Sequence, residues 1–203
     1  LPGHLPNVFG FAEYCGVLWS NDMQPLHLYR NREIETRDET EFSRFGFFDE
    51  DGERQPRGVD QRLLSRRYTE EAVAFLERHR DEPFFLYLAH NAPHVPHFPD
   101  PAHAGESEGG RYGDLVEDLD RSTGAVLAAL DRLGLSERTL VIATSDNGPD
   151  YEGSPGGLRG RKQDTYEGGM RVPMLVRWPS RVAPRARRGA CDQCRVPSNH
   201  YPA

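Results

Sequence analysis

The chain has 203 residues, of which 28% are charged and 36% hydrophobic, and its formal net charge is −7. This acidic balance argues against a nucleic-acid-binding surface, because phosphate backbones are held by faces with a net positive charge. No apolar run reaches the roughly 18 residues that a membrane span needs, so the sequence predicts none. The chain begins with Leu1 rather than methionine, which suggests a start inside a longer protein. The lack of a signal peptide therefore carries no information on compartment.

The first 60 residues are loop-rich, with an aromatic, glycine-punctuated stretch at 7–23 and a charged stretch at 33–57. Residues 63–80 then carry apolar side chains at three- and four-residue spacings, which predicts an amphipathic helix. Pro83 marks the end of this helix. The apolar run FFLYLA at residues 84–89 follows, and it predicts a short strand buried on both faces.

A second helix is predicted over residues 112–133, with Gly134 placed to cap it. The runs TLVIAT at residues 139–144 and MLVRW at 174–178 predict two further buried strands. Strands that alternate with helices indicate an α/β fold, with a mostly parallel sheet and flanking helices.

Two polar residues follow the predicted strand 139–144, and ligands collect at the carboxyl ends of strands in such sheets. Asp146 and Asn147 offer a carboxylate and an amide oxygen, which suit Ca²⁺ or Mg²⁺ better than a soft metal. The competing interpretation is an ordinary turn, since Asn and Gly tolerate left-handed backbone conformations. Composition by itself favours the turn.

Three histidines, His90, His94 and His97, follow the predicted strand 84–89. Two prolines stiffen this segment, which makes it an extended loop rather than a helix face carrying zinc ligands. A histidine held at a strand end is well placed to give a proton or a hydrogen bond to a leaving oxygen. A surface loop rich in His and Pro, without function, is the alternative.

A single lysine, Lys162, stands among 24 arginines, shortly after the Asp146-Asn147 pair. Its ammonium is a compact point charge that can press against one oxygen of an anion, which a planar guanidinium cannot do. Together with the carboxylate and the amide, it suggests a site for an anionic ester. The alternative is a solvated surface lysine that escaped a GC-rich codon bias.

Cysteine chemistry is only weakly indicated. Cys191 and Cys194 form one C-x-x-C, without the second pair that a zinc site needs, and Cys15 lies far away in the sequence. Two ordinary or locally paired cysteines are therefore favoured.

Four motifs in a fixed order carry a family resemblance: PFFLYLAHNAPHVPHFP, GDLVEDLDRSTGAVLAALDRLG, TLVIATSDNGP and GRKQDTYEGGMRVPMLVRWP. In this order they closely resemble the sulfatase family, over roughly residues 7–182. The resemblance implies an alkaline-phosphatase-like α/β sandwich, incomplete here, in which residues 1–182 form the C-terminal portion of a sulfatase catalytic domain. Residues 183–203 are a basic, proline-containing tail unlike the family.

The resemblance also implies roles for four residues. Asp146 and Asn147 match Ca²⁺ ligands, with Mg²⁺ less favoured. Lys162 matches the lysine that contacts the sulfate ester, and His94 the histidine beside the leaving-group oxygen. The implied activity is hydrolysis of a small-molecule or carbohydrate sulfate ester to an alcohol and sulfate. By family analogy the intact parent is periplasmic, secreted or lysosomal.

The chain departs from the family pattern in what it lacks. The family's formylglycine nucleophile arises from a C/S-x-P-S-R motif, and none occurs in these 203 residues. We therefore expect the nucleophile in a missing N-terminal part and an isolated chain that is inactive. The alternatives are a phosphate or phosphonate ester hydrolase of the same superfamily, and a non-catalytic truncated remnant.

Overall fold

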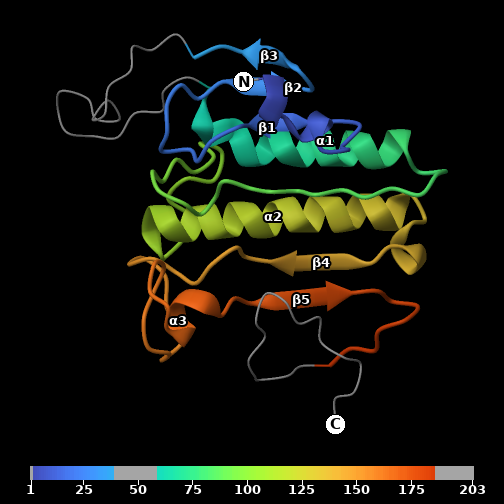
Figure 1. The fold of residues 1–203 in the computed structure, drawn as a ribbon. Helices are drawn as coiled ribbons and strands as arrows, with labels where there is room; N and C mark the ends of the chain where they lie inside the picture. Colours follow the sequence, from blue (N-terminus) through green and yellow to red (C-terminus); the bar gives the residue numbers. More distant parts are fainter. Residues whose placement is uncertain (1, 39–58, 186–203) are drawn as a thin grey trace. The chain divides into compact units, whose positions relative to one another are not determined.

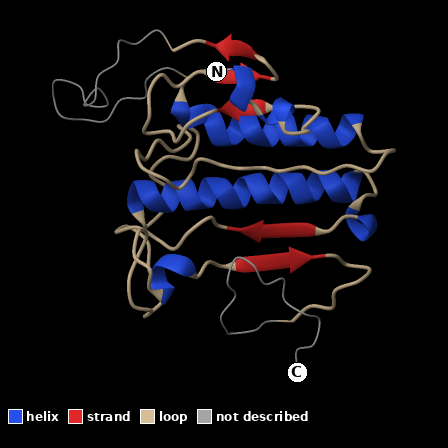
Figure 2. Ribbon diagram, viewed as in Figure 1, coloured by secondary structure: helices blue, strands red, loops and turns tan. Residues whose placement is uncertain are grey.

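The structure, a computed structural model, describes residues 2–38 and 59–185. The chain forms two compact units, Leu1–Ala129 and Leu130–Ala203. Three short strands, one long helix and most of a second helix belong to the first unit, and a two-stranded ladder with a short helix belongs to the second (Figures 1 and 2). Cys191 and Cys194 lie outside the described residues, so their pairing stays a prediction.

A small antiparallel sheet lies within the region expected to be loop-rich. Its strands are β1 (Cys15–Val17), β2 (Leu28–Arg30) and β3 (Glu33–Thr36), in the order β1-β2-β3. Asn31 turns the chain between β2 and β3 with φ 53°, and its side-chain oxygen accepts a hydrogen bond from the Tyr14 N–H at 2.9 Å. Strands of three or four residues are too short to produce a recognisable alternation, so the sequence did not reveal them.

The predicted helix 63–80 is confirmed as α1 (Leu64–Arg78), which a 3₁₀ turn, η3 (Gln61–Leu63), precedes. Asp60 caps this turn by accepting a hydrogen bond from the Arg62 N–H at 3.1 Å. The buried side chains of α1 recur every four residues, as one face of a helix requires; they are Leu64, Tyr68, Ala72 and Leu76. Two of them, Leu64 and Tyr68, join Leu26, Leu28 and Val59 in the core of the first unit.

The predicted strand 84–89 is wrong in two respects. Residues 84–89 run extended but pair with no strand in the described part of the chain. Phe85 and Tyr87 are 74% and 71% exposed, whereas Phe84 is half-buried and packs edge-on against Phe75, with ring centroids 5.9 Å apart. The side chains therefore alternate between a packed face and an exposed face, because burial on both faces needs covering layers that the described residues do not supply.

The second predicted helix, 112–133, is confirmed as α2 (Gly110–Arg132). In the first unit the Thr69 hydroxyl of α1 donates to the Ser122 hydroxyl of α2 at 2.6 Å. Gly134 ends the helix as predicted, with φ 68° and a Leu135 N–H that donates to the Leu130 carbonyl at 2.8 Å. No helix of the described residues is both long and apolar enough to traverse a bilayer.

The second unit contains β4 (Val141–Thr144) and β5 (Met174–Arg177), which confirms two predicted strands. They pair antiparallel, as do β1, β2 and β3, so parallel pairing, which we expected for most of the sheet, is absent among the described strands. Thr144 lies opposite Met174, so the chain leaves β4 and enters β5 at the same end of the ladder. A parallel pair would need a crossover that returns the chain to the opposite end. The intervening loop carries the short helix α3 (Glu167–Met170).

Candidate active site

The loop between β4 and α3 is built on three glycines packed backbone to backbone. A Cβ at Gly148 would overlap the carbonyl oxygen of Gly168, and one at Gly168 would overlap the carbonyl oxygen of Gly160. A Cβ at Gly169 would overlap the carbonyl oxygen of Asp164. The Gly148 N–H donates to the Gly169 carbonyl at 2.9 Å, which ties the end of β4 to α3. No side chain fits between these backbones, which are therefore held in one arrangement.

The predicted metal ligands, Asp146 and Asn147, follow β4 on the loop that these glycine contacts hold. The Asn147 amide nitrogen donates to the Asp146 carboxylate at 2.7 Å, and the Ser145 hydroxyl donates to the same carboxylate at 3.3 Å. Because the Asn147 nitrogen is bonded to the Asp146 carboxylate, the amide oxygen is the atom that remains to coordinate a cation. The pair fits a hard cation in chemistry but falls short of the six to eight oxygens of Ca²⁺. In the described part of the chain, no group of three or more His, Cys, Asp or Glu residues is placed to hold a metal.

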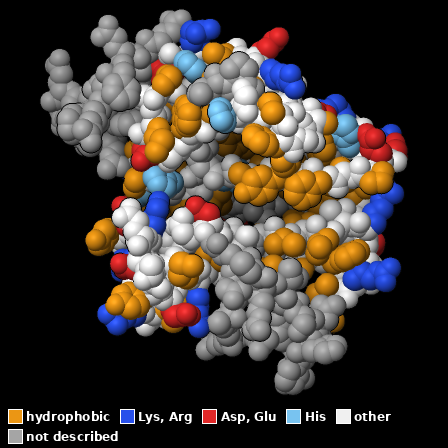
Figure 3. Space-filling model, in the orientation of Figure 1, with side chains coloured by type: hydrophobic (Ala, Val, Ile, Leu, Met, Phe, Trp, Pro, Cys, Tyr) orange, Lys and Arg blue, Asp and Glu red, His pale blue; other side chains and the backbone are white. Residues whose placement is uncertain are grey.

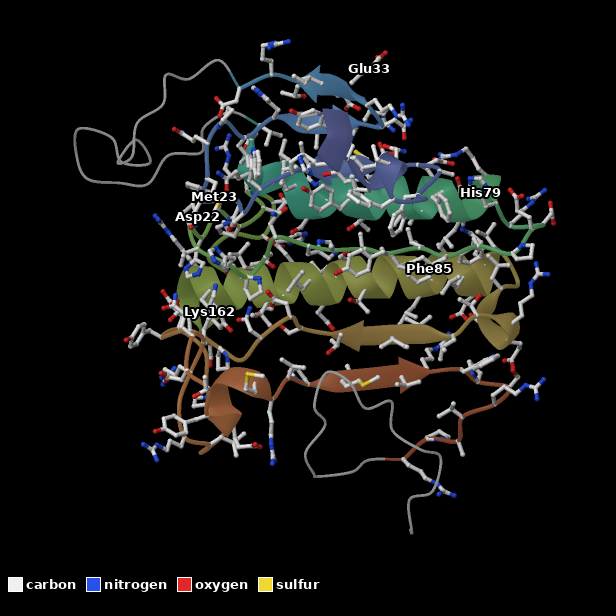
Figure 4. All side chains as sticks on the ribbon, viewed as in Figure 1. Asp22, Met23, Glu33, His79, Phe85 and Lys162 are labelled. Carbon is white, nitrogen blue, oxygen red and sulfur yellow. The ribbon has the colours of Figure 1, made fainter. Side chains whose placement is uncertain are left out.

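Lys162 lies on the same glycine-packed loop as Asp146 and Asn147. Its backbone N–H donates to the Pro149 carbonyl at 2.9 Å, two residues beyond Asn147. The lysine side chain is half-buried on the loop between β4 and α3, where Figure 4 labels it. The neighbouring Arg161 donates to the carbonyls of Asp150 and Gly153, at 2.8 and 2.7 Å, and so closes the loop around itself. The second unit thus carries Asp146, Asn147 and Lys162 on one loop, whose backbone is tied by the bond from Lys162 to Pro149.

His94 belongs to the first unit and is described there by itself. It lies on the loop after the extended segment, where the peptide bonds before Pro93 and Pro96 are cis. Its Nδ1 lies 2.6 Å from the Val95 carbonyl oxygen. A carbonyl can only accept, so Nδ1 carries a proton and donates, and Nε2 is the nitrogen left for a ligand. In the neutral ring Nε2 is therefore an acceptor, and it can give a proton to an oxygen only from the doubly protonated imidazolium.

The other two histidines of this loop have packing roles. His90 Nε2 lies 3.0 Å from the Ser122 hydroxyl of α2, and burial lowers the pKa of His90 to about 4. The ring of His97 meets that of Tyr112 edge-on, with centroids 5.7 Å apart. Both rings are thus engaged in contacts within the first unit.

A larger hollow of about 1050 Å³ lies on the first unit beside the β2–β3 turn, where Figure 4 labels Glu33. Of the three arginines that line it, two are already paired, since Arg30 contacts Glu35 and Glu71 at 2.6 Å and Arg67 contacts Glu35 at 2.6 Å. Ion pairs of this kind leave little positive charge for an anion. The glycine-packed loop is the better candidate, because it carries a lysine ammonium for an anion together with two oxygen ligands for a cation.

The sequence proposed the polar residues of the candidate site but not the backbone contacts that hold them. The three packed glycines were visible as Gly148 and the pair Gly168-Gly169, yet only the structure reveals that they contact one another. The burial of Asn21 and Gln61 beside the His94 loop had no signal in the sequence, because their neighbours come from segments far apart in the chain.

Comparison with known proteins gives one consistent family. A sequence model of the sulfatase family matches residues 7–196. Over 138 residues the chain is 48% identical to the steryl-sulfatase of Mus musculus, covering 63% of this chain and 22% of that protein. It is 38% identical over 139 residues to the N-acetylgalactosamine-6-O-sulfatase of Bacteroides thetaiotaomicron, covering 62% of this chain and 27% of the relative. The chain therefore spans about a quarter of the length of these relatives.

The fold agrees with that family. A sulfatase structure from work on glycosaminoglycan metabolism by Bacteroides thetaiotaomicron matches with a TM-score of 0.75 and 27% identity. The match covers 89% of this chain and 48% of that structure. The chain is thus an α/β fragment of the alkaline-phosphatase-like fold, as the sequence predicted. The chain belongs to the sulfatase family.

Proposed function

We propose that the protein to which this chain belongs hydrolyses a sulfate ester to an alcohol and sulfate, and that this chain supplies one part of the active site. The observation that carries the proposal is the common glycine-packed loop of Asp146, Asn147 and Lys162, in a chain that a sulfatase family model matches over residues 7–196. The relatives named above carry steroid- and sugar-sulfatase names, and a sulfate ester is the substrate class that these names share.

Each residue has a chemical task in this proposal. The Lys162 ammonium faces the sulfate ester and stabilises negative charge that grows on its oxygens. His94, as the doubly protonated imidazolium, gives a proton from Nε2 to the departing alcohol oxygen. Asp146 and Asn147 would hold Ca²⁺ through the carboxylate and the amide oxygen, with Mg²⁺ second. A bound divalent cation would polarise the sulfuryl oxygens. These residues bind and protonate but include no nucleophile.

Sulfatases use a formylglycine nucleophile and a divalent metal, and the 203 residues contain no C/S-x-P-S-R motif from which formylglycine is made. We therefore propose that residues 1–182 act as the C-terminal portion of a catalytic domain. The isolated chain should release no sulfate from an ester. Joining it to the N-terminal part of a related sulfatase that contains the motif should restore turnover.

Lys162 gives the sharpest test of the proposal. In such a joined protein, Lys162→Ala and Lys162→Arg should each lower kcat on an aryl sulfate by on the order of 10² to 10³, since each removes a compact charge beside the transition state. The control is Arg181→Ala, which removes an exposed cation from the same unit and should leave turnover unchanged. Near-normal rates for Lys162→Arg would show that this lysine does not contact the ester.

A further inference from the structure

The buried side-chain amide of Asn21 forms hydrogen bonds to the backbone of the loop that carries His94. The side-chain nitrogen of Asn21 lies 3.4 Å from the His94 carbonyl oxygen and 3.5 Å from that of Pro96. The same nitrogen lies 3.3 Å from the side-chain oxygen of Gln61. Asn21 is separated from His94 by 73 positions in the sequence, so these bonds join distant segments of the first unit.

The orientation of the Asn21 amide follows from its surroundings. Two backbone carbonyls and the Gln61 amide surround one end of the Asn21 amide. That end must be the nitrogen, because an oxygen there would face two carbonyls that can only accept. Two N–H bonds are shared among the three oxygens, which accounts for distances of 3.3, 3.4 and 3.5 Å, longer than those of an ordinary N–H···O bond. Asn21 and Gln61 are only 5% and 6% exposed, so water does not compete freely for these bonds.

Both ends of this arrangement are anchored in the first unit. Gln61 begins η3, whose cap at Asp60 fixes it to the start of α1. Asn21 lies in a turn closed by the Met23 N–H, which donates to the Ser20 carbonyl at 2.9 Å. Leu26, just beyond this turn, is buried in the core. The segments that hold Asn21 and Gln61 therefore both adjoin core residues, Leu26 and Leu64.

The held backbone is also what orients the imidazole. His94 Nδ1 donates to the carbonyl of Val95, the residue between the two carbonyls that Asn21 holds. Fixing the carbonyls of His94 and Pro96 thus fixes the acceptor that sets the ring plane and the tautomer. Asn21 and Gln61 also line a cavity of about 20 Å³ beside His94, so the loop could shift into free space if the amide were lost.

We propose that Asn21, backed by Gln61, is a positioning residue that holds His94 with Nε2 directed at the leaving-group oxygen. This proposal rests on the proposed function for its catalytic part, whereas the holding of the loop can be measured without any activity. A geometric displacement of about 1 Å at such a group lowers turnover by on the order of 10²-fold.

The first measurement is amide hydrogen exchange of the full 203-residue chain at His94, Val95 and His97. Asn21→Leu and Asn21→Asp should each speed exchange at these amides by about tenfold or more, since opening of the loop then loses its tie. The Asp variant nearly preserves the shape but sets an oxygen against the two backbone carbonyls. The control is Asn7→Leu, which removes another amide that holds two carbonyls, those of Phe11 and Ala12 at 3.1 Å. This control should leave exchange at residues 94–97 unchanged.

The second measurement is turnover of the protein joined to an N-terminal sulfatase part. With an alkyl sulfate, whose leaving group needs a proton, the Asn21 variants should lower kcat by on the order of 10-fold to 100-fold with little change in KM. With a nitrophenyl sulfate, whose leaving group needs none, kcat should change by less than about threefold. A merely structural role for Asn21 would lower both rates alike.

The outcomes separate the two proposals. Unchanged exchange at residues 94–97 in both Asn21 variants overturns the positioning role, whatever the rates are. If His94→Ala itself lowers both substrates equally, the proposed function of His94 is wrong. The exchange result then still decides whether Asn21 holds the loop. Faster exchange together with a selective loss on the alkyl sulfate supports both.

Discussion

Asp146 and Asn147 provide the clearest residue-level expectation for metal binding. The described residues supply two oxygen ligands, whereas Ca²⁺ takes six to eight, so the chain by itself should bind Ca²⁺ weakly. Binding should tighten markedly when an N-terminal sulfatase part supplies the remaining ligands. Isothermal titration calorimetry of both proteins with CaCl₂ measures the difference, and Asp146→Asn is the matched control. Equal affinities would mean that the pair is only a turn.

Gly168 is the position at which a single methyl group should do most damage to the site. Gly168→Ala sets a Cβ against the carbonyl of Gly160, and that contact cannot relax because both partners are backbone. We expect a loss of about 1–3 kcal/mol in unfolding free energy, the usual cost of overpacking, as measured by urea denaturation. Gly124→Ala is the control, since it meets nothing within 4 Å and lies in α2, where alanine is the better helix former.

The packing of α1, α2 and the extended segment depends on a neutral histidine. His90 bonds to Ser122, which in turn bonds to Thr69 of α1, and burial lowers the pKa of His90 from 6.5 to about 4. In the unfolded chain the histidine takes up a proton below pH 6.5, whereas the folded chain resists until about pH 4. The unfolded state therefore binds more protons in this window, and stability must fall as the pH falls through it.

The expected size of this effect is about 3 kcal/mol between pH 6.5 and pH 4. Thermal melts across that range measure it, and His90→Gln, which can still bond to Ser122 but cannot take up a proton, should flatten the profile. His79, labelled in Figure 4 at the end of α1, works in the opposite sense. Glu13 and Glu82 raise its pKa, so its contribution is present below its unfolded pKa and is lost as the pH rises through the folded value. Some slope should remain in His90→Gln, because carboxyls whose pKa is lowered, such as Glu71 beside Arg30, also lose stability as the pH falls. A slope as steep in His90→Gln as in the wild type would contradict the assignment.

The elements were predictable from sequence where their signals are local. Apolar residues spaced three and four apart predicted the helices α1 and α2, and the position of Gly134 predicted the end of α2. Strand partners are not local properties. The antiparallel pairing of β4 with β5 depends on where the loop after Thr144 returns, and the exposed face at Phe85 and Tyr87 depends on missing cover. Neither the strand pairing nor the exposed face could be predicted from the local sequence.

The candidate site shows the same division between local and distant information. The sequence motifs and their order along the chain identified four candidate residues: Asp146, Asn147, Lys162 and His94. Their assigned roles stay predictions. The contact between Gly148 and Gly168, and the hold of Asn21 on His94, join segments that are far apart in sequence. Such contacts follow from the folded backbone and could not be read from spacing.

Considered as a whole, the isolated chain exposes apolar side chains that a soluble domain normally covers. Phe85, Tyr87 and Leu175 are each more than 70% exposed, and Figure 3 shows apolar side chains on the face drawn there. The extended segment that carries Phe85 (Figure 4) also leaves backbone groups without a strand partner among the described residues. Edges and patches of this kind favour association. We therefore expect the isolated chain to self-associate.

The double substitution Phe85→Ser and Tyr87→Ser should raise solubility and the monomer fraction with little effect on the melting temperature. Sedimentation velocity and thermal melts measure the two quantities. Phe84→Ser is the matched control, because the half-buried ring of Phe84 packs against Phe75 and its loss should lower stability. A wild-type chain that is monomeric and melts in one sharp transition would show that the exposed face does not drive association.

The return of the chain to the same end of the β4–β5 ladder has a consequence for engineering. Thr144 and Met174 are directly opposite one another, so residues 145–173 form an insertion whose two ends are neighbours. The stretch is closed by its own glycine contacts, and it contains Asp146, Asn147 and Lys162 together. It therefore has the properties of a cassette, which could be exchanged between sulfatases at two adjacent junctions without altering the register of the receiving strands.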